Sequence, residues 1–175
     1  MHIYNIMLAA GKGGIEQAAL DYAEAFVMQN QRVTTWLNPR GWAANMLKRD
    51  VAYLPNFGAW DVFASFRLRR AMLRDAPDAI IAHGNRALSL ALRAAKGICP
   101  VVGVTHNYSI AKRLGRADAA FCITRDLATV AAKHGAPENR VFLIPNMIRI
   151  PELPPRPTRR NPPATTPPTA SAEAF

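Results

Sequence analysis

At 175 residues, half of them apolar, the chain can bury one substantial hydrophobic core, which excludes a disordered or fibrous protein. Its longest apolar runs, such as residues 79–82 and 101–104, are too short to cross a bilayer, and residues 1–4 lack the pattern of a signal peptide. The formal net charge of +10 favours an anionic partner, but the absence of a nucleic-acid-binding motif argues against nucleic acid.

Short apolar strands alternate with amphipathic helices along most of the chain. Residues 3–10 suit a buried parallel strand, residues 11–14 form a glycine-rich turn, and a helix begins at Ile15. Further strands are expected at residues 32–37, 51–54, 78–82, 100–105, 117–123 and 141–144. Further helices are expected at residues 42–48, 60–75, 86–96 and 124–134, with a weak one after residue 107. The alternation predicts an α/β fold, a doubly wound, mostly parallel sheet covered on both faces.

The composition changes abruptly near Pro151. Eight of the chain's fourteen prolines lie in the last twenty-five residues, beside Thr, Arg and Ala. We therefore expect a Rossmann-like domain over residues 1–148 and a Pro-rich disordered tail over residues 149–175. The two cysteines, Cys99 and Cys122, lie in apolar contexts and are expected to be buried and reduced, which is typical of the cytoplasm.

Three turns follow apolar strands directly, at residues 11–14, 83–85 and 105–107. In an open α/β sheet, ligands bind beyond the carboxyl ends of the strands, near the point where the strand order reverses. The first turn is the most specific, because glycines let the backbone approach a ligand and the helix from Ile15 offers N–H groups to an anion. A tight turn without a ligand is the alternative.

Two known phosphate-binding motifs fail at this first turn. A dinucleotide-binding fingerprint needs a third glycine where Glu16 stands, and an acidic residue near residues 37–39, which read Leu-Asn-Pro. A P-loop needs a Lys-Ser/Thr pair after its last glycine, but Ile15 and Glu16 follow Gly14. A Rossmann oxidoreductase is therefore disfavoured.

Four segments together resemble a known family. They are Gly-Gly-Ile-Glu at residues 13–16, the His-containing strand end at residues 102–107, the strand and helix start at residues 117–124, and residues 141–146. In this order and spacing they resemble the N-terminal, acceptor-side domain of a family 4 glycosyltransferase with the two-domain GT-B fold. The resemblance covers about residues 2–148. It implies transfer of a sugar, with retention, from a nucleotide-sugar co-substrate to a glycan or lipid acceptor, without a bound metal or other cofactor.

The resemblance also implies roles for single residues. Gly13 and Gly14 would face the phosphates and sugar of the donor, and Glu16 would order the glycine loop. His106 would lie near the anomeric centre as the candidate catalytic residue; a loop histidine satisfied by neighbouring backbone is the alternative.

Three further polar residues are candidates for an acceptor pocket, namely His83, Asn85 and Asn107. Ordinary turn chemistry is the alternative for these residues.

A basic stripe lies on the helix expected at residues 60–75. Arg67, Arg70 and Arg74 share one face, with Phe63 and Phe66 nearby. A solvated helix face would explain them. The other interpretation is a patch that contacts an anionic membrane, which would place the protein at the inner face of the membrane.

The family pattern breaks after Asn146. In this family a second domain holds the nucleotide through two glutamates separated by seven residues, and no such domain follows here. The resemblance therefore implies an N-terminal half that is inactive alone and needs a separate C-terminal donor-binding domain. The alternatives are a truncated remnant or a non-catalytic α/β binding module that holds an anionic partner.

Overall fold

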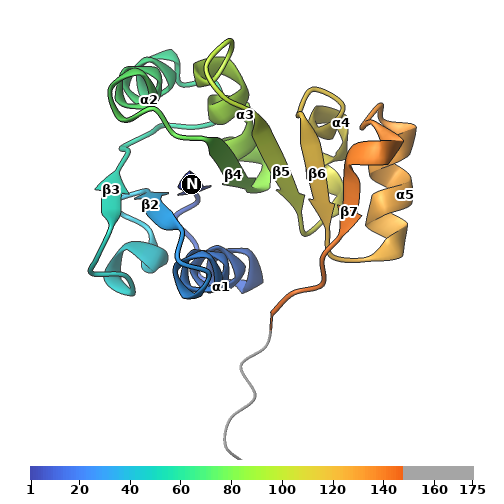
Figure 1. Ribbon diagram of the computed structural model, residues 1–175, viewed down its shortest axis with the longest axis horizontal. Helices are drawn as coiled ribbons and strands as arrows, with labels where there is room; N and C mark the ends of the chain where they lie inside the picture. The colour runs from blue at the N-terminus through green and yellow to red at the C-terminus, as the bar shows by residue number, and fades with distance from the viewer. Residues whose placement is uncertain (148–175) are drawn as a thin grey trace, which may run out of the picture.

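The computed structural model describes residues 1–147, which form one parallel sheet with helices on both faces (Figure 1). The strands are β1 (His2–Met7), β2 (Arg32–Leu37), β3 (Val51–Tyr53), β4 (Ala79–His83), β5 (Val101–Thr105), β6 (Ala119–Cys122) and β7 (Val141–Leu143). The α-helices are α1 (Gly14–Met28), α2 (Val62–Asp75), α3 (Gly84–Ala94), α4 (Ala111–Leu114) and α5 (Arg125–Lys133). Short 3-10 turns form η1 (Trp42–Asn45), η2 (Tyr108–Ile110) and η3 (Glu138–Arg140).

The strand order is β3-β2-β1-β4-β5-β6-β7, and every neighbouring pair is parallel. The chain first builds outward from β1 to β3 and then crosses back to β4, so the order reverses between β1 and β4. This arrangement confirms the predicted doubly wound α/β fold.

The alternation of side chains along β1 divides the core into two layers. Tyr4 and Ile6 are fully buried in the cluster that contains Leu68 of α2 and residues of α3 to α5. Ile3 faces the opposite way and packs with Tyr22 of α1. Figure 1 accordingly shows α1 on one side of the sheet, with α2 and α3 together on the other. Each such buried side chain contributes about 1.5–3 kcal/mol to folding.

The element boundaries differ from the expectations where a polar side chain intervenes. We expected a helix from residue 60, but α2 begins at Val62 because the Asp61 carboxylate accepts a hydrogen bond from the Ala64 N–H at 2.8 Å. Thr124 caps α5 in the same way, as predicted. The helix expected at residues 42–48 is only the 3-10 turn η1, and α3 begins at Gly84, two residues early.

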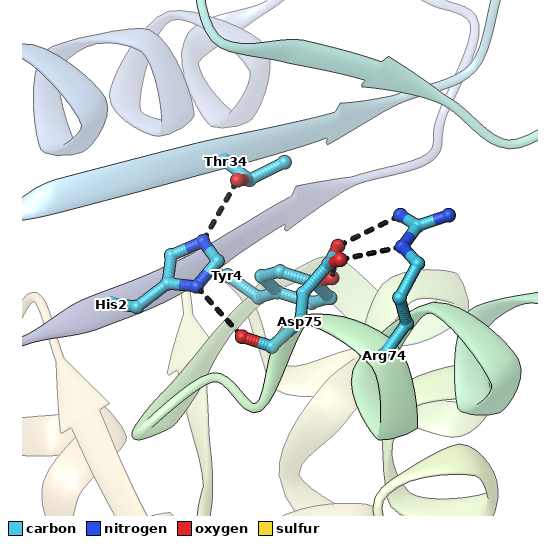
Figure 2. Close-up of polar contacts among 5 residues, drawn as sticks. All are labelled: His2, Tyr4, Thr34, Arg74 and Asp75. Carbon is cyan, nitrogen blue, oxygen red and sulfur yellow. Dashed lines mark hydrogen bonds and ion pairs between the residues drawn. The ribbon is translucent and has the colours of Figure 1, made fainter.

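At the amino end of the sheet, one polar cluster ties α2 to β1 and β2 (Figure 2). The carboxylate of Asp75 accepts hydrogen bonds from the Tyr4 hydroxyl at 2.6 Å and from the Arg74 guanidinium at 2.6 and 2.9 Å. His2 hydrogen-bonds the Asp75 carbonyl and the Thr34 hydroxyl. The Arg74 guanidinium and the Tyr4 hydroxyl lower the pKa of Asp75 to about 2. This cluster lies at the edge opposite the predicted ligand site.

Cys122 is buried and Cys99 is half-buried, and both are free thiols. No helix in residues 1–147 combines the length and apolarity needed to cross a bilayer. The predicted tail, residues 149–175, lies outside the described residues.

Candidate functional site

The three predicted turns meet at the carboxyl edge of the sheet, where the strand order reverses. In the register of the sheet, Met7 of β1 lies opposite His83 of β4, and His83 lies opposite Val104 of β5. The rings of His83 and His106 are stacked, with centroids 5.9 Å apart. A Cβ added at Gly84 would lie 3.9 Å from the side chain of Ile15, so the second turn also approaches the first.

The glycine loop leads straight into α1. Gly13 is the N-cap residue, and no side chain caps the helix there. The N–H groups of the first turn therefore point toward the carboxyl edge of the sheet. Backbone N–H groups and the helix dipole favour an anion at such a position.

Glu16 is buried against this loop. It is 7% exposed, and a Cβ added at Gly13 would lie only 3.1 Å from its carboxylate. Gly13 has an extended backbone with φ of −170°, which any residue can adopt, so close packing on Glu16 is what favours glycine there. This geometry agrees with the predicted loop-ordering role of Glu16, which stays a prediction.

Asn5 of β1, which also hydrogen-bonds Ala19 of α1, fixes the tautomer of His83. The Asn5 side chain donates through Nδ2 to the Ala19 carbonyl at 2.8 Å, so its oxygen faces His83, 2.8 Å from Nε2. Because that oxygen can only accept, His83 carries its proton on Nε2. Its Nδ1 is therefore an unprotonated acceptor, buried and without a hydrogen-bond partner among the described residues.

The surroundings of the two stacked histidines disfavour the protonated form of each ring. Burial lowers the pKa of His83 to about 3, and His106 shifts it in the same direction. Burial likewise lowers the pKa of His106, with a smaller opposing effect from Asn146, although neither ring nitrogen makes a hydrogen bond of normal geometry within the described part. The Tyr22 ring lies edge-on to His83 at 5.0 Å, and burial raises the pKa of Tyr22 to about 12.

Among residues 1–147, four of the six buried side-chain polar atoms without partners lie at this place; the other two belong to Gln31 and Trp36. The Tyr22 hydroxyl, Nδ1 of His83 and both ring nitrogens of His106 lack partners within residues 1–147. Such atoms are rare in folded proteins and usually indicate a bound water or ligand. Neutral donors and acceptors of this kind suit the hydroxyl groups of a sugar.

The sequence comparison identifies the family. A family model described as Glycosyltransferase Family 4 matches residues 12–150 of this chain. The chain belongs to glycosyltransferase family 4. No individual curated protein matches it.

Comparison with solved structures finds the same fold in several proteins. A lipopolysaccharide outer core galactosyltransferase, WaaB, superposes with a TM-score of 0.71 at 16% identity, covering 94% of this chain and 51% of its own. Anabaena Alr3699/HepE, in complex with UDP and glucose, gives 0.69 at 18% identity, covering 85% and 45%. A UDP-GlcNAc 2-epimerase from Methanocaldococcus jannaschii gives 0.62 at 14% identity, covering 83% and 46%.

At these identities the likeness is one of fold, and that fold also carries an epimerase. The family assignment therefore rests on the sequence match and not on the fold. The chain spans about half the length of each of these proteins, and the half it spans is the N-terminal domain of the GT-B fold.

Two of the predicted acceptor-pocket residues, Asn85 and Asn107, hydrogen-bond other side chains of the domain. The side-chain oxygen of Asn85 accepts a hydrogen bond from Arg113 at 2.6 Å. Asn107 is exposed, and its side-chain oxygen accepts bonds from the N–H and hydroxyl of Ser109 at 3.1 and 2.6 Å. Both asparagines thus have the turn and loop contacts of the alternative interpretation, and an acceptor role for them stays a prediction.

Sequence reasoning missed two of the residues that build the site, Asn5 and Tyr22. The signal for Asn5 was present, because an amide in the middle of an apolar strand must find buried partners. Tyr22 packs in the core beneath α1, but its proximity to His83 depends on a strand far away in sequence.

Within residues 1–147, no group of three or more His, Cys, Asp or Glu side chains is placed to hold a metal ion. The expectation that transfer needs no bound metal or other cofactor stays a prediction.

Proposed function

We propose that this domain is the acceptor-side half of a retaining glycosyltransferase that moves a hexosyl group from a nucleotide-sugar to a glycan or lipid acceptor. One observation supports the proposal: in a family 4 chain, the His106 ring stacks on His83, and the turn after His83 approaches Ile15 at the start of α1. The complex of HepE with UDP and glucose supports a UDP-sugar as the donor.

The roles follow from the charges at the site. The N–H groups that follow Gly13 would stabilise the negative phosphates, because they carry the positive end of the α1 dipole. The neutral ring of His106 would hydrogen-bond the sugar at the anomeric centre. The departing phosphate would then take the proton of the acceptor hydroxyl, so that no protein nucleophile and no metal is needed.

Transfer on this proposal needs a second domain. The chain spans about half the length of the matched GT-B structures, and we propose that the nucleoside binds to the other half of that fold. A donor-binding half, in the same polypeptide or a separate one, would supply this site, and residues 1–147 alone would bind the donor weakly.

Saturation-transfer NMR with UDP-glucose and UDP-galactose tests this contact directly. Saturation should reach the hexose protons more than the uridine protons, and the His106→Ala variant should lose it. His134→Ala is the matched control, because His134 is an exposed histidine at the end of α5. Saturation of uridine alone, an undiminished signal in His106→Ala, or tight binding of NAD(P) would contradict the proposal.

A further inference from the structure

The outer surface of α2 and of the loop before it carries a group of large apolar side chains. Phe57 is 100% exposed, Phe63 84% and Trp60 79%. Val62, Phe66 and Leu73 continue the group, each 64% exposed, and their spacing places them along one line of the helix. We call this set the aromatic face: Phe57, Trp60, Val62, Phe63, Phe66 and Leu73.

The aromatic face is not the core side of the helix. Ala64, Leu68 and Met72 lie on the other side of α2 and are at most 2% exposed, packed against the sheet. The helix is therefore apolar on two sides, whereas a helix at a protein surface normally presents polar residues to water. A continuous exposed apolar surface of this kind indicates a partner that covers it.

Positive charge borders the aromatic face on both sides. Arg67 and Arg70 are exposed on the same helix, whereas Arg74, which we had grouped with them, pairs with Asp75. On the side of α3, a cavity of about 200 Å³ adjoins Trp60. Its charged lining residues are all basic: Arg93, Lys96, Arg113 and Arg116.

The acidic groups of this region are already engaged. Asp61 accepts hydrogen bonds from the backbone N–H groups of Ala64 and Phe57, which lower its pKa. Asp75 lies at the far end of α2 with Arg74 and Tyr4. The ionised Asp61 therefore offsets part of the positive charge beside the aromatic face, but Arg67, Arg70 and the four basic residues of the cavity outnumber it.

We propose that the aromatic face is a docking surface for an anionic lipid bilayer. Aromatic rings are favoured at the boundary between lipid headgroups and acyl chains, and arginines beside them attract anionic headgroups. The combination of exposed rings with a border of net positive charge is what distinguishes this surface from one that binds a second copy of the chain, which would place like charges together.

The aromatic face lies near the candidate functional site, so docking would bring the bilayer close to that site. Phe57 and Trp60 follow β3, at the carboxyl edge of the sheet. Their loop is joined to the start of α3 by Arg86, which donates to the side chain of Asn56 and to the Leu8 carbonyl. A bilayer on this surface would lie beside the edge that holds the glycine loop. This consequence rests on the proposed function, whereas the docking itself does not.

Vesicle co-sedimentation of the full chain tests the docking without any sugar transfer. Binding is expected to vesicles of phosphatidylglycerol and phosphatidylcholine, to be weak on phosphatidylcholine alone, and to fall as salt rises. The pair Arg67→Gln/Arg70→Gln should weaken binding about 25-fold, at about fivefold per arginine. The pair Phe63→Ser/Phe66→Ser should weaken it by at least about tenfold.

The matched control removes the same charge elsewhere. Lys133 and Arg140 are exposed on α5 and η3, at the end of the molecule away from α2 (Figure 1). The pair Lys133→Gln/Arg140→Gln should change binding by less than about twofold. When α2 contacts the bilayer, salt screens the attraction between these distant side chains and the lipid headgroups. An equal loss in both charge pairs would overturn the proposal in favour of attraction by net charge alone.

Insertion of the rings has its own measurement. Of the three tryptophans, Trp36 is buried, Trp42 is half-buried and Trp60 is exposed, so brominated lipids should quench Trp60 selectively. The quenching should vanish in Trp60→Phe. Absence of quenching, absence of vesicle binding, or a dimer in solution that Phe63→Ser/Phe66→Ser abolishes would each overturn the docking proposal.

Discussion

The pairing of Asn5 with His83 predicts a measurable energetic coupling inside the site. Replacement of Asn5 by Leu keeps the side-chain volume but removes the bond to the Ala19 carbonyl and the bond from His83. Each bond contributes about 1 kcal/mol, and the Nε2–H of His83 is left buried without a partner at a cost of about 1–3 kcal/mol. We therefore expect Asn5→Leu to lower the free energy of unfolding by about 3 kcal/mol.

The double variant separates this coupling from simple repacking. In Asn5→Leu/His83→Phe both polar partners are replaced by apolar groups of similar shape, so the loss should be only about 1 kcal/mol. His83→Phe alone leaves the buried Asn5 oxygen without its partner and should cost about 1 kcal/mol. Urea unfolding of the four proteins, followed by circular dichroism, gives the coupling energy, which we therefore expect to be about 3 kcal/mol. A coupling below about 0.5 kcal/mol, with equal m-values, would refute the tautomer argument.

Three further predictions concern stability. Because burial holds the folded-state pKa of His83 at about 3, below its ordinary value of 6.5, the unfolded chain takes up the proton first and stability falls as pH drops below 6.5. Between pH 7.5 and 5 this loss should be about 2 kcal/mol in urea titrations and be absent in His83→Phe. Gly103→Ala would place a Cβ 2.6 Å from Leu114 in the core and should destabilise by about 1–3 kcal/mol in thermal unfolding. Tyr4→Phe removes the bond to the Asp75 carboxylate and should lower the urea midpoint by the equivalent of about 1–2 kcal/mol.

The fold could be predicted from the sequence because its signals are local and repeated. Each buried strand is a short apolar run, and each turn after it contains glycine, proline or a small polar residue. Such patterns place the elements to within a few residues. The errors arise at helix starts, where one side-chain hydrogen bond decides the boundary, as at Asp61, or where the chain enters a helix directly from a strand, as at Gly84.

The site could be predicted only as a set of turns. Sequence reasoning placed Gly13 and His106 at the correct edge, because the carboxyl ends of parallel strands meet there. It could not give the tautomer of His83, which depends on Asn5, seventy-eight residues away in sequence. It also gave Arg74 the same role as Arg67, since helical spacing does not reveal the ion pair with Asp75.

The charges at the carboxyl edge of this family 4 domain are mixed. Arg86 and Arg113 lie at this edge, where they hydrogen-bond the Leu8 carbonyl and the Asn85 side chain, and Lys12 belongs to the glycine loop. The buried carboxylate of Glu16 lies beside the same loop. A nucleotide-sugar carries a doubly charged pyrophosphate, which on the proposed function the start of α1 and these cations would oppose. The stacked histidine rings would instead contact the sugar, whose hydroxyl groups need partners and carry no charge.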